Sequence, residues 1–161
     1  MTDETSGQTR VTAEPGKQEI VITRVFDAPR DLVFETFTNP DLIPDWWGPA
    51  RLSTTVDRME VRSGGSWRFV QREADGPEFG FHGVFHEVSP YRIVQTFEFE
   101  GVPGHVALET ATFEDLGGGR TRYTGRSVYQ SLEDRDGMVA SGMESGARES
   151  MDRIADLLSK G

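Results

Sequence analysis

Two histidines on one segment, His82 and His86, are the first residues to test for metal chemistry. They lie in FGFHGVFHEV, whose aromatic and β-branched composition predicts a strand. A strand rises about 3.3 Å per residue, so the two imidazoles would lie roughly 13 Å apart, too far to share one ion. The chain also has no cysteine. We therefore predict no metal site, and expect each histidine to face solvent or to make a polar contact inside a cavity.

Carboxylates are numerous, but none has the spacing of an acid–base pair. Four of them fall on predicted strands and are expected to face water: Glu87, Glu98, Glu109 and Glu114. A general acid or base needs a buried carboxylate with a shifted pKa beside a substrate, which sequence does not show. Ser127 and Ser150 lack the context of a nucleophile elbow. The clustered glycines belong to turns and do not open a helix, so no nucleotide site and no cofactor is predicted.

Aromatic side chains offer a binding surface instead. On predicted strands, four of them share one parity and should point to the concave face of a sheet: Trp67, Phe69, Phe97 and Phe99. Four more aromatic residues on the predicted strands could join them on that face: Phe81, Phe85, Tyr123 and Tyr129. An apolar stripe on a sheet is ordinarily core. These positions alone therefore leave both alternatives open, a plain core and a ligand pocket.

The stretch PDLIPDWWGPA places Trp46 beside Trp47. Neighbouring residues diverge by about 100° on a helix and point to opposite faces of a strand, so the rings cannot share one direction. We predict a short helix that starts at Asn39-Pro40 and ends at Gly48-Pro49. Trp46 is expected to be the more buried anchor, and Trp47 is expected to lie nearer the mouth of a pocket.

The elements that must position these residues follow from periodicity and turn signals. Residues 1–16 are polar and read as a disordered tail before a single domain of residues 17–161. We predict a strand at 18–26, helices at about 29–38 and within 40–47, strands from 51 to 129, and one long helix at about 132–159. The last helix carries an apolar stripe: Val139, Met143, Ala147, Met151, Ile154 and Leu158. The fold class is therefore α+β, a curved antiparallel sheet of about six or seven strands around a long C-terminal helix.

Charge and composition narrow the partners. The formal net charge is −10 at pH 7, which opposes binding to nucleic acid and to anionic membranes. No segment reaches the roughly 20 apolar residues that would span a bilayer, and the N-terminus does not resemble a signal peptide. The lack of cysteine fits a reducing cytosol, so we expect a cytoplasmic protein. Small molecules or other proteins, including a second copy in a homodimer, remain as partners.

Five segments in register resemble a known family. They are FDAPRDLVFETFTNPDLIPDWWGP at 26–49, VRSGGSW at 61–67, FHGVFHEVSPYRIVQTFEF at 81–99, GGGRTRYT at 117–124 and GMESGARESMDRIADLL at 142–158. Together they resemble the START-like, helix-grip (SRPBCC) superfamily, in the branch named after the C-terminal domain of the Hsp90 ATPase activator. That branch is akin to calicheamicin-resistance-type and polyketide cyclase-like proteins. The resemblance implies a cavity between sheet and C-terminal helix that takes a hydrophobic small molecule.

One position departs from the family pattern. Relatives usually carry a bulky aromatic residue directly after the glycine that corresponds to Gly146, where this chain has Ala147. Either the helix sits closer to the sheet or volume is left beneath it, which a ligand would fill. We predict a cavity lined by Trp46, Trp47, Trp67, Phe69, Phe81, Phe97, Phe99, Tyr123, Met143, Ala147 and Met151. Its polar candidates are His82, Gln95 and Glu109.

Three functions remain open at this point. The first is a carrier, sensor or sequestering protein for a hydrophobic or aromatic molecule, self-resistance included, without catalysis. The second is a cyclase- or hydratase-like enzyme for a polyketide-like substrate, which a buried carboxylate facing the cavity would favour. The third is an Hsp90 co-chaperone. The eukaryotic activator carries a separate N-terminal domain, for which 161 residues leave no expected room.

Overall fold

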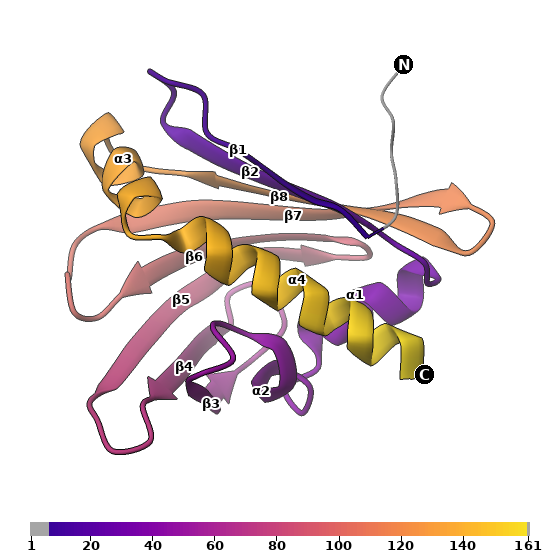
Figure 1. Ribbon diagram of the computed structural model, residues 1–161, viewed down its shortest axis with the longest axis horizontal. Coiled ribbons are helices and arrows are strands. Elements are labelled where there is room, and N and C mark those ends of the chain that lie inside the picture. The colour runs from indigo at the N-terminus through magenta and orange to yellow at the C-terminus, as the bar shows by residue number, and fades with distance from the viewer. Residues whose placement is uncertain (1–6, 161) are drawn as a thin grey trace.

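Eight strands form one antiparallel sheet in the computed structural model, which describes residues 7–160 (Figure 1). Their order across the sheet is β1-β2-β8-β7-β6-β5-β4-β3, so the first hairpin joins the end of a six-strand meander. The strands are β1 (Thr9–Thr12), β2 (Glu19–Phe26), β3 (Ser53–Met59), β4 (Ser66–Arg72), β5 (Glu78–Ser89), β6 (Arg92–Phe99), β7 (Val106–Gly117) and β8 (Arg120–Val128). The predicted α+β class with a covered antiparallel sheet is confirmed.

Four helices accompany the sheet within the described residues: α1 (Arg30–Thr38), α2 (Ile43–Trp46), α3 (Leu132–Ala140) and α4 (Met143–Lys160). Figure 1 shows α4 crossing the sheet diagonally, with α1 and α2 beside it. Helix α4 buries Met151 and Ile154, and α1 buries Val33, so their apolar faces and one face of the sheet share a single core.

Alternation along the strands separates that core from solvent. On β4, Trp67, Phe69 and Gln71 are buried, while the residues between them are more exposed. Register shifts interrupt three ladders, between β3 and β4, between β5 and β6, and between β7 and β8. Such bulges increase local bending and twist, which lets the sheet wrap around α4.

Strand β1 lies within residues 1–16, which were expected to be a disordered tail, so that expectation is wrong for Thr9–Thr12. With β1 the sheet has eight strands, more than the six or seven that were predicted. Thr9–Thr12 pair antiparallel with Val21–Arg24 on β2. The segment is too short and too polar to stand out by hydrophobicity, and its position depends on the edge of β2. Residues 1–6 lie outside the described residues.

The predicted single helix over 132–159 is also wrong, because the chain forms α3 and α4 with a break at Gly142. That glycine has φ of 85°, a conformation which ends a helix and which other residues rarely adopt. Val139, predicted to lie in the buried stripe, is 44% exposed. Its four-residue spacing to Met143 therefore does not mark one continuous helical face.

A buried arginine fastens α4 to the edge of the sheet. The Arg24 side chain is 5% exposed, and its Nη1 donates to the Oγ1 of Thr9 on β1 and to Oδ1 of Asp152 on α4, each at 2.8 Å. Arg148 of α4 also donates to the carbonyl oxygen of Thr9. A buried cation is tolerated when it is paired in this way, so β1, β2 and α4 hold one another in place.

Candidate functional site

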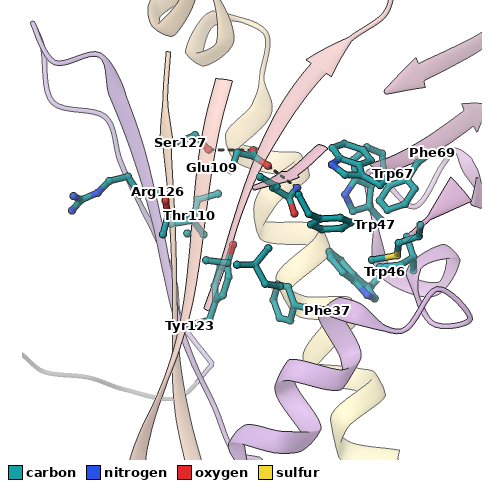
Figure 2. Close-up of a pocket in the computed structure, with 18 of the residues that line it drawn as sticks. Phe37, Trp46, Trp47, Trp67, Phe69, Glu109, Thr110, Tyr123, Arg126 and Ser127 are labelled. Carbon is teal, nitrogen blue, oxygen red and sulfur yellow. Dashed lines mark hydrogen bonds between the residues drawn. The ribbon is translucent and has the colours of Figure 1, made fainter. Parts of the chain in front are cut away.

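A cavity of about 190 Å³ lies between the sheet, α2 and α4 (Figure 2). Strand alternation places its floor, because Gln95 on β6, Glu109 on β7 and Ser127 on β8 are cross-strand neighbours on one face. Met151 from α4 and Trp46 from α2 close it on the helical side. The cavity therefore lies where the sheet is covered by helices.

Aromatic rings form two clusters along the cavity wall. In one, Trp47 lies 5.1 Å from Phe69 and 6.5 Å from Trp67, measured between ring centroids. In the other, Phe37 stacks on Tyr123 at 4.7 Å and lies 5.1 Å from Trp46. Figure 2 shows Tyr123 and Phe37 together, with Trp67, Phe69 and Trp47 grouped apart from them. The walls are thus stiff, flat and rich in π faces.

Both tryptophans of the WWGP segment line the cavity. Trp46, the last residue of α2, is 7% exposed, and its Nε1 donates to the carbonyl of Thr36 at 3.0 Å. Trp47 is half-buried and leaves the helix with extended backbone, φ −74° and ψ 126°, which turns its ring to a different part of the wall. The expected order of burial holds, but α2 has only four residues and begins at Ile43, later than predicted.

Glu109 places a carboxyl group in this largely apolar site. The amide of Gln95 donates to its Oε1 and the hydroxyl of Ser127 donates to its Oε2, each at 3.3 Å. Burial raises the pKa of Glu109 to about 7, although both hydrogen bonds act to lower it. Glu109 is partly buried and lines the cavity, so the expectation that it faces water is wrong. The side chain can hold or release a proton near neutral pH.

Two phenols share the electrostatic environment of Glu109. Burial raises the pKa of Tyr123 above its usual range, and the negative charge of Glu109 makes a smaller contribution in the same direction. The same causes raise the pKa of Tyr129 to about 12. Figure 2 shows the Tyr123 hydroxyl on the side of its ring that faces Glu109. A side chain at Gly125 would collide with that hydroxyl, because an added Cβ would lie 2.1 Å from it.

Eight of the predicted residues meet around this cavity: Trp46, Trp47, Trp67, Phe69, Tyr123, Met151, Gln95 and Glu109. Six others do not line it. Three of these lie on the inner face beside Trp47 and Trp67: Phe81, Phe97 and Phe99. The Phe81 ring stacks on Phe99 and contacts Phe97 and Trp47, while Phe97 contacts Trp67. They therefore support that part of the wall.

The helix positions Met143 and Ala147 lie on the first turns of α4, beyond the cavity. An added Cβ at Gly146 would meet no atom within 4 Å, so this glycine does not permit a close approach to the sheet. The volume expected beneath Ala147 therefore lies further along α4, next to Met151.

His82 lies on the face of β5 that points away from the cavity. The prediction that it contributes a polar group to the cavity is therefore wrong. Its Nδ1 lies 2.9 Å from Glu100, and its Nε2 lies 3.3 Å from Glu98. Arg68 bonds the same Glu100 and, with His82, lowers the pKa of that carboxyl to about 2. Among residues 7–160, no three side chains of His, Asp or Glu are grouped so that they could hold a metal ion.

Sequence reasoning missed several lining residues. Phe37 and Ile43 come from helices, while Ile22, Met59, Ile93, Ala111, Gly125 and Ser127 come from the sheet. Thr110 and Arg126 also border the cavity, but their side chains point away from it, and Arg126 faces Glu19 at 3.7 Å (Figure 2). Strand parity with Tyr123 would have found Gly125 and Ser127. The helical residues had no such signal.

The family model for Activator of Hsp90 ATPase homolog 1-like proteins matches residues 27–159. The chain belongs to this family. The resemblance seen in the sequence is thereby confirmed, and proteins of this fold commonly bind hydrophobic ligands. No curated protein matches the chain significantly.

Two solved structures show how widely the family's fold is shared. A protein from Arthrobacter aurescens, solved by NMR, is 27% identical with a TM-score of 0.85 over 94% of this chain and 92% of its own. The crystal structure of protein Ms6760 from Mycobacterium smegmatis is 24% identical, with a TM-score of 0.83 over 93% and 96%. Within residues 7–160, no helix has the length and apolarity needed to cross a membrane.

Proposed function

We propose that this member of the Activator of Hsp90 ATPase homolog 1-like family binds a small aromatic molecule in the cavity around Glu109. The observation that carries the proposal is a cavity of about 190 Å³ with aromatic walls and a carboxyl group that lines it. Ligand sites generally combine apolar lining with a few placed polar groups, which is the composition seen here. A carrier, sensor or sequestering role is consistent with this arrangement.

The volume indicates the size of the ligand. A cavity of about 150 Å³ in another protein binds benzene. Drug-sized ligands occupy roughly 300–1,000 Å³. A cavity of about 190 Å³ therefore fits one aromatic ring with a short substituent. A polyketide-like molecule would extend beyond these walls.

Ligand binding should be visible in tryptophan emission, because the three tryptophans of the chain all line the cavity. We expect propylbenzene, 2-phenylethanol or 4-nitrotoluene to change the emission and to raise the melting temperature. Saturation at 100 times the dissociation constant would add about 2.7 kcal/mol to the free energy of unfolding. Fluorescence titration and differential scanning fluorimetry measure both effects.

A variant that fills the cavity provides the control. Ala111 lines it on β7, so Ala111→Leu should abolish the response to all three compounds. Ala140→Leu, at an exposed position on α3, should leave the response unchanged. If none of the compounds alters emission or melting temperature in the unmodified protein, the proposal is contradicted.

Glu109 supports a second candidate function, proton transfer in a cyclase- or hydratase-like reaction. A carboxyl group with a pKa of about 7 is suited to act as a general base near neutral pH. Its carboxylate would take a proton from the carbon next to a carbonyl group, which leaves an enolate. The same carboxyl, after exchanging its proton with solvent, would then return a proton to that carbon.

Deuterium exchange tests this function without knowledge of the substrate. The protein is expected to accelerate exchange of the α-hydrogens of phenylacetone in heavy water, followed by NMR. Glu109→Gln should remove the acceleration, because an amide does not accept the proton. Equal exchange with and without protein, at concentrations where the ketone binds, would exclude this activity.

A further inference from the structure

Glu109 lacks a cationic partner in the part of the chain that the structure describes. Its two hydrogen bonds come from neutral groups, the amide of Gln95 and the hydroxyl of Ser127. Arg126, which borders the cavity, directs its guanidinium away toward Glu19. Buried carboxylates in proteins are ordinarily paired with a cation or a metal ion. A positively charged ligand can therefore supply the counter-charge that Glu109 lacks.

The walls beside this carboxyl group suit a cation as well. The aromatic rings of Trp47, Trp67 and Tyr123 line the same cavity. Aromatic faces attract ammonium groups through the ring quadrupole, most strongly where the site is shielded from water. A carboxylate and several aromatic rings around one small cavity are the two features that recognise an organic ammonium ion.

We propose that the ligand is an arylalkylamine with one ring, bound in its protonated form, with the ammonium group on Glu109 and the ring between the aromatic walls. This inference rests on the proposed binding function and adds the chemical class of the ligand. The short chain between ring and nitrogen follows from the cavity volume of about 190 Å³.

Charge separates this ligand from others of equal size. A neutral alcohol can donate one hydrogen bond to Glu109 but leaves the negative charge without a counter-ion. A carboxylate ligand would bring a second negative charge into the cavity. An ammonium ion alone satisfies both the hydrogen-bonding and the charge of Glu109.

The test compares three probes of similar size at pH 8.5, by titration calorimetry: 2-phenylethylamine, 2-phenylethanol and 3-phenylpropanoate. At this pH Glu109, with a pKa of about 7, is ionised, and the nearby phenols Tyr123 and Tyr129 are neutral. We expect the amine to bind at least tenfold more tightly than the alcohol. The carboxylate should bind more weakly than either.

Glu109→Gln should weaken binding of the amine at least tenfold and change binding of the alcohol less than twofold. The matched control is Glu114→Gln, on the same strand, where the carboxylate is exposed and pairs with Arg122. Equal affinities for amine and alcohol, or an unchanged amine affinity in Glu109→Gln, would overturn this inference and leave the binding function intact. Failure of all three probes to bind would overturn this inference, and it would overturn the binding function as well if propylbenzene and 4-nitrotoluene also fail to bind.

Discussion

Replacing Trp46 by Phe is expected to lower the free energy of unfolding by about 2–4 kcal/mol. The indole is 7% exposed, and its Nε1 donates to the carbonyl of Thr36. In a longer helix that carbonyl would accept from the amide of residue 40, but Pro40 has no N–H. Phe would therefore leave both a buried acceptor without a donor and a gap beside Phe37. Urea denaturation, followed by circular dichroism, measures the loss.

Trp47→Phe is the matched control. Trp47 is half-buried, and it is its backbone carbonyl that accepts hydrogen bonds, from Thr54 and Gln71, so Phe can keep both. We expect a loss below about 1.5 kcal/mol together with an altered fluorescence response to cavity ligands. Equal losses for the two variants would show that Trp46 is not the structural anchor of the pair.

The second large effect concerns pH. Burial raises the pKa of Glu109 from the ordinary 4.5 to about 7. Between these two pH values the folded protein keeps a proton on Glu109 that the unfolded chain has already released. The free energy of unfolding should therefore fall as pH rises from about 4.5 to about 7, by roughly 3 kcal/mol from this residue. Below the lower value both states are protonated, and above the higher value the loss is complete.

Glu109→Gln isolates this contribution from all other titrating groups. The variant should be more stable than the unmodified protein by about 3 kcal/mol at pH 8.5 and of similar stability at pH 4. Guanidinium denaturation at both pH values gives the comparison. A difference between the two proteins that does not change with pH would show that Glu109 titrates normally.

Much of the fold could be predicted because it depends on local patterns. The turn glycines and the β-branched runs predicted the meander, and the stripe of Met151, Ile154 and Leu158 predicted a covering helix. Strand β1 was missed because Thr9–Thr12 is stabilised by β2 and Arg24, and both lie outside the segment itself. The break at Gly142 was missed because Val139 and Met143 keep a helical spacing across it.

The site was harder to predict than the fold. Alternation along a strand shows which side of the sheet a residue faces, but it does not show whether the residue lines the cavity or packs elsewhere on that side. Phe97 and Phe99 were assigned correctly to the concave face, yet they lie outside the cavity. Glu109 shows the larger difficulty. Glu109 lines a cavity whose other walls include Trp46 and Met151, residues far away in sequence, and burial raises its pKa. The strand sequences, which contain several glutamates, could not single it out.

The place of the first hairpin in the sheet has a consequence for synthesis of the chain. Strand β2 pairs with β8, so Glu19 lies opposite Val128, and Arg24 finds its carboxylate partner only at Asp152. On the ribosome, the N-terminal strands emerge long before the residues that complete them. The free edge of β2 and the charge of Arg24 therefore remain without these partners until β8 and α4 have been made. Folding of this domain can therefore be completed only once α4, which follows all eight strands in the described residues, has emerged.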